Sequence, residues 1–159
     1  MRLKDKTAII TGGGSGIGLA TARAFSKEGA KVILFGRRKE KLISAADELG
    51  GSVLIVQGDM THNDDLDQLI NKTLNNFKGI DILVNSAGLY NGAPLHEISD
   101  SQWDGIMDIN IRSIFQLTRR VLPIMMAQKS GSIVHISSIL GLIAVPHVAA
   151  YNVSKGALN

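Results

Sequence analysis

TGGGSGIG, at residues 11–18, is the stretch that decides the fold. An apolar run at Thr7–Ile10 leads directly into it, and a segment with helical spacing follows. The early glycines permit a tight turn and close approach to a ligand, and the last lets the helix pack on the strand. The helix N-terminus then offers N–H groups and a partial positive charge to a pyrophosphate. We therefore expect a dinucleotide at this turn, although glycines alone also mark ordinary tight turns.

Five short apolar runs predict strands that are covered on both faces. They lie at Thr7–Ile10, Lys31–Phe35, Val53–Gln57, Ile80–Asn85 and Ser132–Ser137. Longer segments with helical spacing alternate with them. Such alternation requires a parallel sheet with right-handed crossovers and helices on both faces. The sequence therefore predicts one α/β domain over residues 1–159, built on a doubly wound, Rossmann-like parallel sheet.

Two helical segments are predicted in more detail. In the first, Ile17, Ala20, Ala24 and Phe25 are expected to share the buried face, and Gly29 ends the helix. The last long segment, from about residue 101 to 128, is expected to be one helix capped by Ser99 and kinked at Pro123.

Composition excludes several other classes of protein. The chain has no cysteine, which excludes disulfides, thiolate metal sites and a catalytic thiol. The N-terminal apolar run is too short for a membrane span, so we expect a cytoplasmic protein without a membrane partner. Despite a net charge of +3, basic residues are scattered apart from 37–39, so we expect no nucleic-acid partner. The four histidines lack ligand-like spacing, and we expect no metal.

The TGxxxGxG pattern resembles the glycine turn of the short-chain dehydrogenase/reductase family, and further motifs along the whole chain support the resemblance. Asn85-Ser86-Ala87-Gly88 is similar to the family's NNAG segment, with Ser in place of the second Asn. Tyr151-Asn152-Val153-Ser154-Lys155 is similar to its YxxxK signature, and Ser138 precedes it by thirteen residues. The resemblance implies cofactor contacts from the following residues: Gly12, Gly14, Ser15, Gly16, Ile17, Gly18, Arg37, Asp59, Met60, Asn85, Ala87, Gly88, Tyr151 and Lys155.

Tyr151 and Lys155 stand four residues apart on a predicted helix, so their side chains share one face. The pKa of a free phenol is about 10, which is too high for efficient proton exchange near neutral pH. A nearby ammonium favours the phenolate. The resemblance implies that Tyr151 is the acid in carbonyl reduction and the base in alcohol oxidation. It implies that Lys155 assists this ionisation and binds the nicotinamide ribose. Catalytic roles also follow for Ser138, as a hydrogen-bond donor to the substrate oxygen, and for Asn110, as the holder of a water linked to Lys155.

The end of the second predicted strand favours NADP(H) over NAD(H). Rossmann domains that bind NAD usually place an acid there to hold the ribose 2′-hydroxyl. This chain has no carboxylate at that point, and Arg37 could instead pair with a 2′-phosphate. Two observations leave the alternative open: Arg37 and Arg38 could simply face solvent, and Ser15 is uncharged where many NADP-using relatives carry a basic residue.

The resemblance implies the strand order 3-2-1-4-5. Family members continue well beyond the position of Asn159, so it also implies two further strands, the sixth and seventh, and a substrate-closing segment that this sequence lacks. Strand 132–137 would then be an uncovered apolar edge.

Two functions follow: an NAD(P)-dependent oxidoreductase acting on a carbonyl or alcohol, or a catalytically incompetent dinucleotide-binding fragment that needs a partner chain. The mostly small or apolar stretches 89–95 and 140–150 favour a hydrophobic substrate. For a full-length protein we expect a homo-oligomer, a dimer or a tetramer.

Overall fold

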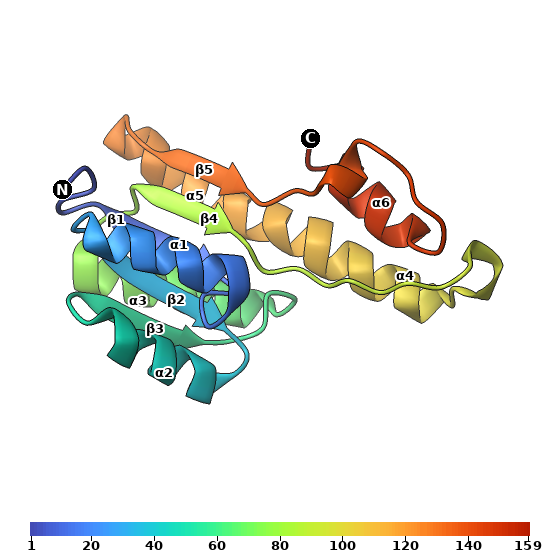
Figure 1. Cartoon of the computed structure of the whole chain (residues 1–159). Coiled ribbons are helices and arrows are strands. Elements are labelled where there is room, and N and C mark those ends of the chain that lie inside the picture. The colour runs from blue at the N-terminus through green and yellow to red at the C-terminus, as the bar shows by residue number, and fades with distance from the viewer.

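The computed structural model describes all of residues 1–159, and strands alternate with helices along the chain (Figure 1). The strands are β1 (Thr7–Thr11), β2 (Lys31–Gly36), β3 (Val53–Gln57), β4 (Ile82–Asn85) and β5 (Ser132–His135). The helices are α1 (Gly16–Lys27), α2 (Lys39–Leu49), α3 (Asn63–Phe77), α4 (Asp100–Met107), α5 (Ser113–Gln128) and α6 (Ala149–Gly156). Three short helical turns complete the chain: η1 (Leu95–Glu97), the π-helical η2 (Asp108–Arg112) and η3 (Ile139–Gly141).

The sheet has the order β3-β2-β1-β4-β5, and every neighbouring pair is parallel. The doubly wound, Rossmann-like α/β fold and its strand order are therefore confirmed. The chain reverses its direction of travel across the sheet between β1 and β4, and in such sheets ligands bind beyond the carboxyl ends of the strands at this point. Helices α4 and α6 project beyond the carboxyl ends of the strands (Figure 1).

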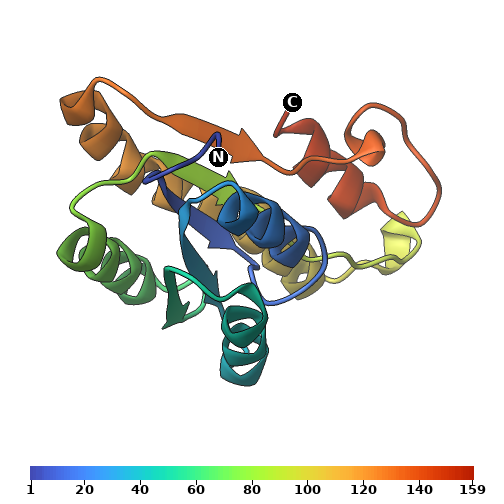
Figure 2. The ribbon, with the colours of Figure 1, turned by 60° about the vertical axis from the view of Figure 1, so that its left-hand side comes forward.

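Helices cover both faces of the sheet, as Figures 1 and 2 show. On one face, side chains of α3 and α5 pack on the strands around Ile9, Phe35 and Leu117. On the other, α1 and α2 pack around Leu34 and Leu42. These side chains are at most 1% exposed, and burying each contributes about 1.5–3 kcal/mol. None of the helices is long and apolar enough to span a bilayer.

The predicted buried face of α1 is wrong. Ile17, Ala20 and Ala24 are exposed, whereas Gly18 and Ala22 are buried. A Cβ on Gly18 would lie only 2.5 Å from the carbonyl oxygen of Gly12. The helix therefore approaches the glycine turn through its smallest residues, and the larger Ile17 is left on the outer side.

The long helix predicted near residues 101–128 is interrupted. A capping box forms at Ser99, whose hydroxyl accepts from the Gln102 backbone N–H, as expected for an N-cap. The π turn η2 then separates α4 from α5 and buries Asn110 completely. Pro123 lies within α5, which continues to Gln128.

Two predicted strands are shorter than expected because side chains take over their backbone hydrogen bonds. The Gln128 amide binds both the N–H and the C=O of Ile80, so β4 begins only at Ile82. The C=O of Ile136 accepts from Lys155 Nζ, and β5 ends at His135. As expected, β5 is an edge strand, and Val134 is 42% exposed.

Candidate active site

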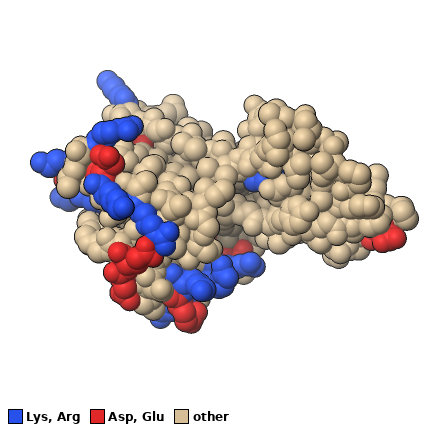
Figure 3. Space-filling view, viewed as in Figure 1, with Lys and Arg blue, Asp and Glu red and all other residues tan.

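A cavity of about 360 Å³ opens at the carboxyl ends of the strands. The glycine turn forms one wall, the segments after β2 and β3 form the next, and the segment after β4 closes it. The following predicted cofactor residues line it: Gly12, Gly14, Ser15, Gly16, Ile17, Arg37, Asp59, Met60, Ala87 and Gly88. In the space-filling view a notch separates the sheet from the part of the chain beyond its edge (Figure 3).

Thr11 ties the glycine turn to the segment after β4. Its side chain is fully buried, and its hydroxyl oxygen accepts from the backbone N–H groups of Ser86 and Ala87, both at 3.0 Å. Gly12 has φ +66°, and a Cβ there would lie 3.1 Å from the Ala87 backbone. Both its backbone conformation and its surroundings therefore require glycine, and the cavity wall stays open to a ligand.

Arg37 and Asp59 form an ion pair at the mouth of the cavity, with Arg37 Nη1 3.8 Å from Asp59 Oδ2. Partial burial would by itself raise the pKa of Asp59. Hydrogen bonds from the backbone N–H and hydroxyl of Thr61, together with the Arg37 charge, outweigh burial and lower that pKa. Asp59 is therefore ionised at neutral pH, and it partly neutralises Arg37.

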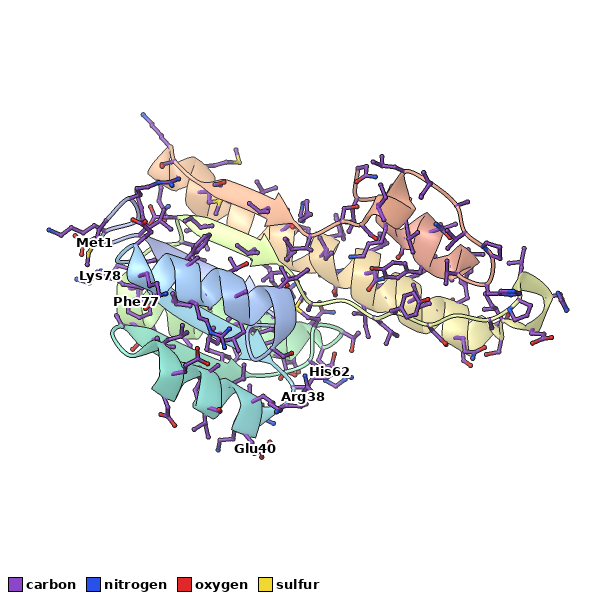
Figure 4. The ribbon with its side chains drawn as sticks, viewed as in Figure 1. Met1, Arg38, Glu40, His62, Phe77 and Lys78 are labelled. Atoms are coloured by element: carbon purple, nitrogen blue, oxygen red, sulfur yellow. The ribbon has the colours of Figure 1, made fainter.

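Arg38 supplies the basic group that the glycine turn itself lacks. Its guanidinium donates to the Ser15 hydroxyl at 3.2 Å, and Lys41 lines the same cavity. Figure 4 shows Arg38 and His62 together at the carboxyl ends of the strands, whereas Met1 and Lys78 lie at the opposite end. Sequence reasoning singled out Arg37 and missed Arg38 and Lys41. The signal was the basic run at 37–39, followed by Lys41 in the first turn of α2.

Asn85 and Gly18 lie outside the cavity lining. Gly18 lies under the turn, where it makes the close contact with Gly12. Asn85 is 1% exposed, and its Nδ2 lies 3.0 Å from Nδ1 of His135 on the paired strand β5. Burial lowers the pKa of His135, which keeps its ring neutral and able to accept this hydrogen bond.

Lys155 is held at both ends. Its side chain is 6% exposed, and Nζ donates to the Ile136 carbonyl at 2.7 Å. Its own backbone carbonyl accepts from the Ser137 hydroxyl at 3.0 Å. Burial lowers the pKa of Lys155. Nζ would also lie 3.8 Å from a Cβ on Gly88, so the ammonium reaches the inner end of the segment that lines the cavity.

Tyr151 and Lys155 share one face of α6, as their spacing predicts. Lys155 Nζ lies 5.6 Å from the centre of the Tyr151 ring. The Tyr90 ring packs edge-on against Tyr151, with centroids 5.1 Å apart. The ring of Tyr151 is thus fixed between the ammonium and the segment after β4.

Asn110 uses its side chain as a clamp. Oδ1 accepts from the Leu89 N–H at 2.7 Å, and Nδ2 donates to the Leu89 carbonyl and the Ser154 hydroxyl, both at 2.9 Å. The amide therefore joins η2 to the segment after β4 and to α6. The water that the family resemblance assigns to Asn110 stays a prediction.

Ser138 caps η3, and its hydroxyl oxygen accepts from the Leu140 N–H at 3.2 Å. The structure thus brings Asn110, Tyr151 and Lys155 together on η2 and α6, with Ser138 at the start of the turn that packs on α6. None of these four residues lines the cavity, although Ile109, the neighbour of Asn110, does.

The strand order and the glycine turn at the switch point define a Rossmann-like α/β protein. The sequence profile of the short chain dehydrogenase family matches residues 6–159, and the chain belongs to that family. The family consists of dehydrogenases and reductases and implies a nicotinamide cofactor.

Similar proteins carry the same assignment. An uncharacterized oxidoreductase of Staphylococcus aureus (strain USA300) is 39% identical over 158 residues, which cover 99% of this chain and 68% of the relative. One from Staphylococcus epidermidis is 32% identical over 99% of this chain and 69% of its own length. The crystal structure of a short chain dehydrogenase from Bacillus anthracis superimposes with a TM-score of 0.93 at 32% identity, covering 98% of this chain and 66% of that one. This chain thus spans about two thirds of the length of these relatives.

Proposed function

We propose that this protein is an NADP(H)-dependent oxidoreductase that transfers a hydride between the nicotinamide and a carbonyl or secondary alcohol. The observation that carries the proposal is the buried Lys155 ammonium beside the Tyr151 ring, next to the inner end of the glycine-walled cavity. Tyr151 and Lys155 are polar groups in a position to act on a substrate oxygen, and the family supports this reaction class.

The residues present fit a dinucleotide. The first turn of α1 leaves backbone N–H groups without helical partners, and these face the glycine turn where a pyrophosphate would lie. Glycine is required at Gly12 by its positive φ and by the closeness of Ala87, so no side chain fills this part of the wall. The adenosine half would lie between the segments after β2 and β3, near Asp59 and Met60.

The nicotinamide, when bound, supplies or accepts the hydride. In carbonyl reduction the Tyr151 hydroxyl would give its proton to the substrate oxygen, and in alcohol oxidation Tyr151 would take up the proton of the substrate hydroxyl. The Ser138 hydroxyl donates a hydrogen bond to the same oxygen and stabilises the charge that develops there. Lys155, whose Nζ lies 5.6 Å from the centre of the Tyr151 ring, would bind the ribose of the nicotinamide half.

The preference for NADP(H) is proposed from the cations around the cavity. Arg37, Arg38 and Lys41 line it, and the Asp59 carboxylate offsets part of the Arg37 charge. Arg38 also contacts the glycine turn through Ser15, so it fits a 2′-phosphate better than Arg37 does. A charged hydrogen bond is worth about 1.5–3 kcal/mol, or roughly 10- to 150-fold in affinity. We expect Arg38→Ser to weaken NADPH binding by that factor and NADH binding by less than twofold; equal losses for both cofactors would overturn the preference.

An apolar substrate is proposed from the surface beyond the strand ends. Leu142, Ile143 and Val153 are exposed there, on the segment before α6 and on α6 itself. In Figure 3 charged side chains gather over the sheet and α1–α2, whereas few appear on the part formed by α4 and α6. A panel of ketones of increasing apolar size tests this, and we expect KM to fall as apolar size increases.

Tyr151→Phe tests the catalytic assignment. General acid catalysis contributes about 10²- to 10⁴-fold, so kcat should fall by that factor while NADPH still binds. Tyr90→Phe removes the same atom from the neighbouring ring and should cost far less. Near-full turnover by Tyr151→Phe would contradict the assignment.

The alternative function is dinucleotide binding without turnover, in a fragment that needs a partner chain. The observation that favours it is the length of this chain, 68% of that of the S. aureus relative. Purified protein that binds NADPH but reduces no carbonyl of the panel would support this alternative.

We also propose a homo-oligomer that forms through α5. Phe115, Leu122 and Met126 are 55%, 43% and 74% exposed on this helix. Apolar side chains gathered in this way mark interaction surfaces. Sedimentation should show a dimer or tetramer that Met126→Glu dissociates, and a monomer at all concentrations would contradict the proposal.

A further inference from the structure

Both peptide groups that flank the Cα of Leu140 are hydrogen-bonded to side chains. The carbonyl of Leu140 accepts from Asn152 Nδ2 at 2.6 Å, and its N–H donates to the Ser138 hydroxyl oxygen at 3.2 Å. The second N–H of the Asn152 amide donates to the Ile143 carbonyl at 2.9 Å. One side chain of α6 therefore holds the turn η3 at Leu140 and the segment that follows it at Ile143.

This arrangement determines how Ser138 can bond. A hydroxyl has one donor and two acceptor positions. Because the Leu140 N–H occupies one acceptor position, the Ser138 hydroxyl hydrogen stays free to donate to another group. The N–H and the C=O of Leu140 belong to the two peptide groups on either side of its Cα. By holding the second group, Asn152 restricts movement of the Leu140 backbone and so keeps the N–H of the first group directed at Ser138.

Asn152 also couples Ser138 to Tyr151, because it directly follows Tyr151 on α6. Close packing at Gly141 reinforces the coupling, since a Cβ there would lie 2.6 Å from the Lys155 carbonyl oxygen. The turn after β5 is thus attached to the helix that carries both Tyr151 and Lys155.

We propose that Asn152 is a positioning residue that orients the Ser138 hydroxyl toward the substrate oxygen by holding the backbone of Leu140. This inference rests on the proposed function, in which Ser138 stabilises the charge on that oxygen. Asn152 itself does not touch the substrate, so its contribution depends on Ser138.

A double-mutant cycle tests this dependence. Asn152→Asp keeps the side-chain size but replaces two donors by a carboxylate that faces two carbonyls. We expect kcat to fall about tenfold or more, within the roughly 10²- to 10³-fold worth of one oxyanion donor, with the KM for NADPH unchanged within about twofold. In a Ser138→Ala background the same substitution should have almost no further effect. If the double variant instead lost kcat by the product of the two single losses, Asn152 would act independently of Ser138, and the proposal would be overturned. Asn152→Gln should recover part of kcat because it keeps the donors.

Amide hydrogen exchange tests the clamp without turnover. Exchange at Leu140 should accelerate in Asn152→Asp and stay at the wild-type rate in Val153→Ala, an exposed neighbour on the same helix. Unchanged exchange at Leu140 would overturn the proposal. If the wild-type protein turned over no carbonyl while Leu140 exchange responded, the proposed function would fail and the clamp would stand.

Discussion

Asn85 and His135 face each other across strands β4 and β5, with Asn85 Nδ2 3.0 Å from His135 Nδ1. This pair joins the edge strand to the strand that leads into the cavity wall. A neutral imidazole can accept at Nδ1, whereas a protonated ring cannot. Protonation of His135 therefore removes a link between these strands.

We predict that stability falls in mild acid through His135. Burial lowers its pKa in the folded state. Above the ordinary value of about 6.5, both folded and unfolded states are neutral and this residue adds no pH dependence. As pH falls below that value, the unfolded state binds more protons than the folded state, so the free energy of unfolding decreases until the folded-state pKa is passed.

Thermal unfolding between pH 7.5 and 5 measures this effect. The Tm of His135→Gln should fall less between pH 7.5 and 5 than the Tm of the wild type. His96→Gln, whose histidine is exposed, should behave like the wild type. Equal acid sensitivity of His135→Gln and the wild type would contradict the prediction.

Thr11→Val should destabilise the protein because it leaves two backbone N–H groups, those of Ser86 and Ala87, without an acceptor. Each buried unpaired group costs about 1–3 kcal/mol. Urea unfolding should show a loss in this range or above it, and Thr11→Ser, which keeps the hydroxyl, should lose clearly less. If the free energy of unfolding of Thr11→Val lay within about 0.5 kcal/mol of the wild-type value, these hydrogen bonds would contribute little to stability.

Gly18→Ala should disrupt the glycine turn, because the new Cβ would lie 2.5 Å from the Gly12 carbonyl oxygen. We expect a loss of more than about 3 kcal/mol in the free energy of unfolding, as for other severe backbone clashes. Gly105→Ala is the control, since nothing lies within 4 Å of its Cβ position in α4. It should gain about 0.5–1 kcal/mol from helix propensity. A Gly18→Ala protein as stable as the wild type would be incompatible with the described packing.

Much of the fold could be predicted because the sequence alternates between apolar runs and helical spacing. The five strands and their parallel pairing follow from that pattern, whereas their order was predicted from the family resemblance. The buried face of α1 could not, because the close approach at Gly18 outweighs the size of Ile17, and hydrophobic spacing does not record such contacts.

The candidate site was predictable as a set of residues but not as a set of contacts. Motif spacing placed Tyr151 and Lys155 on one helix face. It gave no sign that Arg38 reaches Ser15 or that the Asn110 amide clamps Leu89, because both contacts join segments distant in sequence. It also gave no sign that Asn85 pairs with His135 across β4 and β5, and its assignment to the cofactor stays a prediction.

Calorimetric titration of the purified chain with NADPH and NADH tests the central claim, that the glycine-walled cavity binds NADP(H). We predict saturable binding of NADPH, tighter than NADH by about tenfold or more, with a gap that shrinks in Arg38→Ser. Absence of saturable binding by either dinucleotide, or NADH binding as tight as NADPH, would contradict this account.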